Sequence, residues 1–217
     1  MLPDEPAAPE PVQAQPMPLT PVCFLLTGLC VLFYLVDIAQ HGHLFERMDL
    51  YGPDVKAGEW WRVFTCTLAH GGALHLLFNL SAVWTLGRML EAGIGTFRFA
   101  VTTVLGALGS AFGVLLVNFE QPTLGISGVI LAWAGAMLPI ATKTGRRQLG
   151  TWLVQVLIIS LLPHVSWAGH AGGFVFGIPA GWVMRKGPAV FRSVAPLMLF
   201  AGGVLVYLIG SGRLGLR

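Results

Sequence analysis

The chain has 217 residues, of which 55% are hydrophobic and only 11% are charged, and its formal net charge is +3. A soluble globular domain carries about 25% charged residues because its surface faces water. The low charge and the mean hydropathy of +0.73 therefore exclude a soluble domain and predict an integral, multi-pass membrane protein. The basic residues stand in short clusters between apolar runs, which indicates membrane topology rather than nucleic-acid binding.

The three cysteines do not form a recognisable metal site or disulfide framework. Cys23 and Cys30 lie seven residues apart in one apolar run, and Cys66 stands alone. Neither a CxxC pair nor a Cys/His ligand spacing is present, so structural zinc is not expected. We expect all three to be small buried hydrophobic side chains, and we expect no metal and no other cofactor.

Residues 1–19 are predicted to be a disordered, proline-rich cytoplasmic tail. The first 20 residues hold six prolines, three acidic residues and no Lys or Arg. A secretory signal needs a basic start followed by an apolar stretch, so this segment does not resemble one. Its composition is typical of a chain that cannot form a packed core.

Seven apolar segments approach the length of about 20 residues that a helix needs to cross a membrane. We therefore predict an all-α, polytopic transmembrane bundle, with a six-helix core over residues 20–192 and an additional transmembrane helix within 193–217. One long loop, residues 40–69, separates the first two helices, and the other connections are short. The predicted helices cover residues 20–39, 71–90, 97–117, 127–142, 149–163, 168–184 and 194–211.

Lysine and arginine alternate between the two sides of the predicted bundle. Eight lie in or beside the second–third, fourth–fifth and sixth–seventh connections, whereas the third–fourth and fifth–sixth connections have none. Because positive loops stay inside, the amino terminus is predicted to be cytoplasmic, with the long loop and the carboxyl terminus outside. No organelle-targeting segment is visible, which favours a bacterial inner membrane. The eight residues are Arg88, Arg98, Lys143, Arg146, Arg147, Arg185, Lys186 and Arg192.

Polar side chains collect near the outer ends of the second, fourth and sixth predicted helices. These are His75 and Asn79 on the second, Ser127 on the fourth and His170 on the sixth. Counted from the basic residues at the inner ends, all four fall within one layer, roughly 5–15 Å below the outer surface. Polar groups inside hydrocarbon are costly and tend to mark function, so a shared depth indicates a common site.

The chemistry of these residues is that of serine catalysis. A serine hydroxyl needs a base to remove its proton, and histidine has a suitable pKa, so Ser127 is the candidate nucleophile and His170 its base. His75 and Asn79 are spaced i, i+4 and share one helix face, so both can donate hydrogen bonds to one oxyanion together with the Ser127 N–H. No Asp or Glu lies within the fourth, fifth or sixth helix, which predicts a Ser–His dyad without a third member.

Each of these features also has a simpler structural interpretation. Gly125 and Gly128 flank Ser127, where they would let backbone and substrate approach closely, but small residues in membrane helices usually serve packing. His170 alone could be a hydrogen-bonded residue of the bundle. The second-helix pair could join neighbouring helices. The common depth favours a site over these separate explanations.

Other conspicuous residues lie in the long loop or on the sixth helix. Trp61 could belong to an interfacial aromatic belt, and Arg62 could anchor at the headgroups. His70 could support the loop or face water. Gly173, Gly177 and Gly181 recur at intervals of four, which predicts a smooth face where the sixth helix packs, most naturally against the fourth.

Taken together, these motifs resemble those of the rhomboid family of intramembrane serine proteases. The resemblance runs from about residue 37 to residue 181 and includes Trp61-Arg62, the run HGGALHLLFN at 70–79, GISG at 125–128, and His170 followed by spaced glycines. One difference is Leu131, one turn after the serine, where many members carry an aromatic residue.

The resemblance implies a nucleophile at Ser127, a general base at His170, and an oxyanion hole formed by His75, Asn79 and the Ser127 N–H. Trp61 and Arg62 would belong to the family's membrane-embedded first loop. The implied substrates are single-pass membrane proteins in the lipid bilayer, cut near the outer end of the spanning segment, with no metal or nucleotide.

Two other functions are compatible with parts of the sequence. A non-catalytic rhomboid-like chaperone or quality-control protein would bind membrane helices without cutting them, but such proteins usually lack the serine or the histidine, and both are present. A small transporter or channel would carry polar residues through the inner halves of its helices, and here those halves are nearly all apolar. Proteolysis is the favoured hypothesis.

Overall fold

The computed structural model describes residues 18–163 and 165–213. Within these ranges the fold is all-α, and the one β pairing is an isolated bridge between Leu50 and Thr123. Most of the predicted tail lies outside the described residues. The elements are α1 (Pro21–Ala39), α2 (Phe45–Met48), α3 (Gly52–Lys56), α4 (Arg62–Thr65), α5 (Ala73–Ala82), η1 (Val83–Gly87), α6 (Arg88–Ile94), α7 (Thr96–Val117), α8 (Ser127–Ile140), α9 (Lys143–Ser160), α10 (Trp167–Met184) and α11 (Pro188–Gly210).

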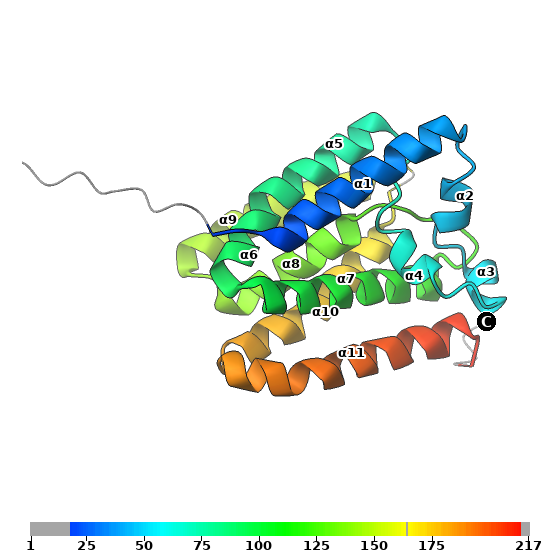
Figure 1. Ribbon diagram of the computed structural model, residues 1–217. Coiled ribbons are helices and arrows are strands. Elements are labelled where there is room, and N and C mark those ends of the chain that lie inside the picture. Colours follow the sequence, from blue (N-terminus) through cyan, green and yellow to red (C-terminus); the bar gives the residue numbers. More distant parts are fainter. Residues whose placement is uncertain (1–17, 164, 214–217) are drawn as a thin grey trace, which may run out of the picture.

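The helices form an elongated bundle whose long members run side by side (Figure 1). In the described part of the chain α1, α7 and α11 are both long and apolar enough to cross a membrane, and α8 is a shorter apolar helix. The connections that carry the basic clusters lie at one end of the bundle, and the loop helices α2, α3 and α4 lie at the other (Figure 1). The all-α bundle agrees with the sequence prediction, while the number of crossing helices stays a prediction.

Two predicted helix starts differ from the observed ones by more than a turn. The fifth predicted helix starts at residue 149, but α9 starts at Lys143, where the Thr142 hydroxyl accepts a hydrogen bond from the Gly145 N–H at 3.1 Å. The last predicted helix starts at residue 194, but α11 starts at Pro188 behind Gly187, whose φ is 105°. In both cases polar or basic residues that suggested a connection belong to the first turns of a helix.

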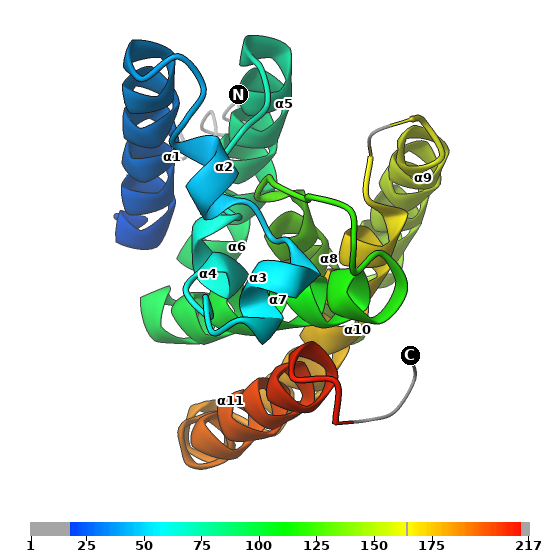
Figure 2. The same ribbon diagram turned by 90° about the vertical axis from the view of Figure 1, so that its right-hand side faces the viewer.

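The centre of the bundle is a close contact among α7, α8 and α10 (Figure 2). A Cβ added to any of three glycines of α10 would collide with a backbone carbonyl oxygen of α8. The helices therefore touch backbone to backbone, which confirms the predicted packing of the sixth helix against the fourth. The pairs in this glycine seam are Gly173 with Gly128, Gly177 with Ala132, and Gly181 with Ala136.

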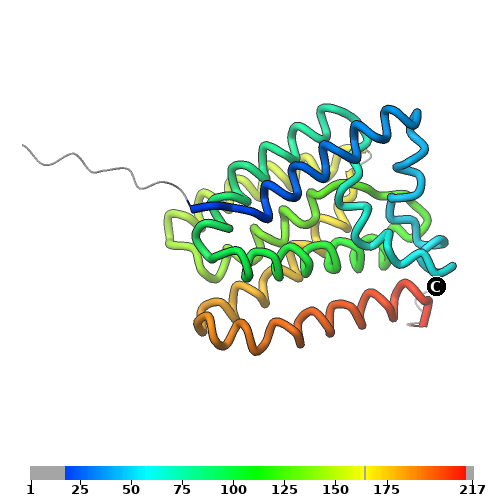
Figure 3. The backbone as a smooth tube through the Cα atoms, viewed as in Figure 1, coloured from blue at the N-terminus to red at the C-terminus, as the bar shows by residue number. Residues whose placement is uncertain are grey.

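The second predicted span is one helical run with a π-helical turn in its middle (Figure 3). The run passes from α5 through η1 into α6. At the end of η1, Gly87 lies against the buried Trp133 ring, because an added Cβ would stand 2.9 Å from that ring. In α6, the carboxylate of Glu91 is only 1% exposed and accepts hydrogen bonds from the N–H groups of Val22 and Cys23 at 3.0 and 2.9 Å. Glu91 thereby satisfies the free amino end of α1.

The long first loop folds around one buried arginine. The Arg62 guanidinium donates to Asp49 Oδ1 at 2.6 Å and to Glu59 Oε2 at 2.7 Å, and it forms an ion pair with Asp54 Oδ2 at 2.8 Å. It also donates to the backbone oxygens of Glu46 and Asp49. Burial raises the pKa of Asp49 to about 6, while the positive charge of Arg62 acts in the opposite direction. Arg62 therefore organises the loop from within and does not anchor at headgroups.

Neighbouring tryptophans connect this loop to its surroundings in different ways. Trp61 is 53% exposed, which fits an interfacial position. Trp60 packs against Tyr207 of α11 with ring centroids 5.4 Å apart, and its ring also contacts Gly210. The last helix thus covers α7 and braces the first loop.

Candidate active site

Ser127 and His170 meet at the outer end of the glycine seam. The Ser127 Oγ lies 2.8 Å from the Nε2 of His170, which is a hydrogen bond between side chains 43 residues apart in sequence. Ser127 is the first residue of α8, and His170 lies in the first turn of α10. Gly128 follows Ser127 by one residue and Gly173 follows His170 by three, and these two glycines are in backbone contact. Seam packing therefore sets the distance between hydroxyl and imidazole.

The segment before Ser127 is shaped by Gly125. Its φ of 118° is a conformation that other residues rarely adopt, and its N–H donates to the carbonyl of Cys66 at 2.8 Å. A Cβ at this position would stand 2.8 Å from the ring of His75 and 3.8 Å from the amide nitrogen of Asn79. Glycine thus lets the backbone that leads into Ser127 pass directly beside the two side chains of α5.

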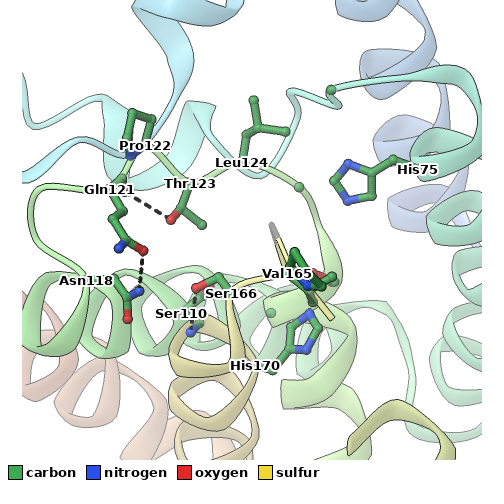
Figure 4. A pocket seen from close by; sticks show the side chains of 16 residues that line it. His75, Ser110, Asn118, Gln121, Pro122, Thr123, Leu124, Val165, Ser166 and His170 are labelled. Carbon is green, nitrogen blue, oxygen red and sulfur yellow. Dashed lines mark hydrogen bonds between the residues drawn. The ribbon is translucent and has the colours of Figure 1, made fainter. Parts of the chain in front are cut away.

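His75 and Asn79 lie on the face of α5 that is turned toward this segment. The Asn79 amide donates to the His75 carbonyl at 3.1 Å, and Asn79 is buried while the His75 ring is partly exposed. Figure 4 shows the His75 ring across the cavity from His170. His75, Ser127 and His170 thus line one cavity from three helices, whereas Asn79 lies outside its lining. The role of the α5 pair as oxyanion donors stays a prediction.

His70 lies behind His75 and does not face water. Its side chain is fully buried, with Nδ1 3.3 Å from the carbonyl oxygen of Leu68 and its ring centroid 5.1 Å from that of His75. Burial lowers the pKa of His70 to about 4, and the nearby His75 acts in the same direction. A neutral His70 therefore packs against the His75 ring, and of the two interpretations of the sequence the one in which it faces water is wrong.

A cavity of ≈ 830 Å³ opens over the Ser127–His170 pair (Figure 4). Its walls come from α5, α7, α8, α10 and the connection before α8. Polar lining groups include His75, Ser110 and Asn118. In the described ranges no three His, Cys, Asp or Glu side chains come close enough to hold a metal ion. A cavity with a hydrogen-bonded serine and histidine at its floor has the geometry that acyl transfer requires.

One residue in contact with the Ser127–His170 pair is not among those that the sequence predicted. The Nδ1 of His170 lies 2.6 Å from the Oγ of Ser160, at the end of α9. The sequence offered one signal: Ser160 is the only hydroxyl in the apolar run from residue 156 to residue 162. In contrast, Trp61 and Arg62 belong to the first loop and do not line the cavity.

The fold and the site define a helical membrane protein with a serine–histidine pair in a polar cavity. Residues 57–187 match the family model described as the Rhomboid domain. The chain is 32% identical over 184 residues to RHOMBOID-like protein 5 of Arabidopsis thaliana, covering 73% of this chain and 59% of that protein. It is 31% identical over 180 residues to rhomboid protease GlpG of Salmonella newport (strain SL254), covering 75% and 63%.

A third relative is rhomboid protease GluP of Bacillus subtilis (strain 168), 29% identical over 167 residues that cover 71% of this chain and 33% of the relative. The matched part of this chain holds His70, His75, Asn79, Ser127 and His170. The chain belongs to the rhomboid family. It spans between one third and somewhat under two thirds of the length of these relatives.

Proposed function

We propose that this protein is an intramembrane serine endopeptidase that cleaves transmembrane segments of single-pass membrane proteins near the outer membrane face. The observation that carries the proposal is the 2.8 Å hydrogen bond between Ser127 Oγ and His170 Nε2 at the floor of the cavity. Membership of the rhomboid family supports it, because two of the relatives are named as rhomboid proteases.

The proposed reaction uses a Ser–His dyad. His170 Nε2 takes the proton of the Ser127 hydroxyl while Oγ attacks the carbonyl carbon of the scissile peptide. The tetrahedral oxyanion accepts hydrogen bonds from the Ser127 N–H, which is free at the start of α8, and from His75 and Asn79. His170 then gives its proton to the departing amine, and water releases the acyl group from Ser127 in a second round.

The proposed substrate follows from the depth of the cavity. The 14 residues of α8 span about 21 Å, which is shorter than the roughly 30 Å hydrocarbon core. A nucleophile at the outer end of this short helix would lie below the membrane surface. A peptide bond in a helix is shielded by its own turn, so a substrate whose helix unwinds easily would be preferred.

The proposed orientation of the protein in the membrane is the one that the basic residues predict. The connections that carry arginine and lysine would face the cytoplasm together with the amino terminus, and the first loop and carboxyl terminus would lie outside. A bacterial inner membrane is the proposed location. The relatives come from bacteria and from a plant, so an epitope accessibility assay in the source cell would test location and orientation together.

Substitution of the dyad tests the function. In proteoliposomes with a model single-pass substrate, Ser127→Ala and His170→Ala should each lower the cleavage rate by roughly 10³-fold or more. Ser81→Ala, on the exposed side of α5, should cleave normally. Persistent cleavage by purified Ser127→Ala protein would exclude the assigned nucleophile.

The alternative, a non-catalytic protein that holds membrane helices, makes a different prediction for the wild type. It should bind the substrate without cutting it, and a fluorophosphonate probe should leave Ser127 unlabelled. The hydrogen bond at Ser127 favours the protease, since a binding protein has no need for a serine aligned with an imidazole.

A further inference from the structure

The imidazole of His170 is held on both of its nitrogens. Nε2 faces Ser127 at 2.8 Å, and Nδ1 faces the hydroxyl of Ser160 at 2.6 Å. Ser160 is the last residue of α9 and is only 4% exposed. In the described ranges no carboxylate forms a hydrogen bond or an ion pair with His170. The hydroxyl of Ser160 occupies the position where a third catalytic group would stand.

The second partner of Ser160 decides the direction of this hydrogen bond. Its Oγ lies 2.7 Å from the carbonyl oxygen of Val156, one turn earlier in α9. A carbonyl oxygen can only accept, and a serine hydroxyl has a single proton, so that proton points to Val156. Oγ then offers a lone pair to His170, and Nδ1 must carry a hydrogen.

The state of Nδ1 determines the state of Nε2. In a neutral imidazole only one nitrogen carries a hydrogen. With the hydrogen on Nδ1, Nε2 has a free lone pair directed at the Ser127 hydroxyl, which is the arrangement a general base requires. The opposite tautomer would place a hydrogen on Nε2 and could not accept the proton of Ser127.

We infer that Ser160 is a positioning residue that holds His170 in the Nδ1–H tautomer with Nε2 toward Ser127. In this arrangement Ser127 donates to His170, His170 donates to Ser160, and the Ser160 hydroxyl donates to the Val156 carbonyl. The three hydrogen bonds form one directed relay across α8, α10 and α9. The relay also explains how the imidazole is oriented in a chain with Leu131 one turn after the nucleophile. Its catalytic consequence rests on the proposed function, whereas the tautomer itself does not.

Histidine NMR tests the tautomer directly. In protein labelled with ¹⁵N-histidine in bicelles, the His170 signals are identified by their loss in His170→Gln. Their long-range proton–nitrogen pattern should be that of Nδ1–H in the wild type, and Ser160→Ala should shift the population toward Nε2–H. Thr102→Val is the control, because Thr102 is a buried hydroxyl that also donates to a carbonyl one turn earlier, Arg98 O at 2.8 Å.

Two NMR results would overturn the inference: an Nε2–H tautomer in the wild type, or an unchanged tautomer in Ser160→Ala. In the cleavage assay, Ser160→Ala should lower kcat roughly two- to tenfold at unchanged KM, the effect of one neutral hydrogen bond, and Thr102→Val should not. If the wild-type protein cleaves nothing, the proposed function fails while the NMR result still decides the role of Ser160.

Discussion

Helices α8 and α9 are neighbours in sequence but are held in the protein very differently. All nine residues of α8 from Gly128 to Ala136 are buried, and the helix touches α10 backbone to backbone. Along the 18 residues of α9, only Leu149 and Ser160 are buried. In Figure 2, α8 lies inside the bundle and α9 at its edge. The contrast separates a helix at the centre of the packing from one at the surface of the bundle.

The candidate site joins these two kinds of helix. Ser127 and His170 belong to the tightly packed pair α8 and α10, whereas His75 with Asn79 comes from α5 and Ser160 from α9. Like α9, α5 has few buried residues, and its exposed residues include Leu74, Leu77 and Phe78. Substitutions of packing residues in α8 and α10 should therefore lower stability, whereas substitutions of the site residues in α5 and α9 should lower activity first.

The largest effect is expected from the tryptophan of the packed helix. Trp133 is fully buried, donates to Thr103 Oγ1 at 3.0 Å and packs on Phe99 with centroids 4.7 Å apart. Trp133→Ala should lower the free energy of unfolding by about 3–5 kcal/mol, measured by denaturant titration in mixed micelles. Trp152→Ala on α9, where the ring is half-buried, should cost less than half as much. Equal losses would contradict the contrast between the two helices.

A catalytic effect without a large change in stability is expected at α5. If Asn79 donates to the oxyanion, Asn79→Ala and His75→Ala should each raise the activation free energy by about 2.7–4 kcal/mol, roughly 10²- to 10³-fold in kcat. The unfolding free energy should change little, because the Asn79 amide bonds to its own helix at His75 O. Loss of folding with a normal rate in the folded fraction would show that the pair only joins helices.

The smallest effects are expected when the same substitution, glycine to alanine, is made at one position in the packed seam and at one position on α9. Gly177→Ala places a Cβ against the Ala132 carbonyl, so it should destabilise by about 1–3 kcal/mol. Gly150→Ala on α9 meets nothing within 4 Å, so it should stabilise by about 0.5–1 kcal/mol through helix propensity. Thermal unfolding of both variants measures the difference, and a Gly177→Ala protein no less stable than the wild type would show that the two helices can move apart to admit a methyl group.

Much of this arrangement was predictable because apolar runs and recurring glycines reflect helix burial directly. The seven predicted segments all correspond to helices, and the α10 glycines lie on α8 as expected. The polar network was less accessible. Glu91 caps α1 from almost 70 residues away, and Ser160, a single hydroxyl in an apolar run, shows its role only through its contact with the His170 ring. Such roles depend on tertiary contacts that neither hydropathy nor spacing encodes.

The π-helical turn η1, Val83–Gly87, holds one residue more than an α-helical turn would. Deleting any one of these five residues would let the run close into an ordinary α-helix, with the helix on each side left facing as before. Glu91 would then still reach the amino end of α1 while His75 kept its place. Deleting a residue from α5 or α6 would instead turn everything beyond it by about 100°. Of the whole second span, this turn should therefore tolerate the loss of one residue best.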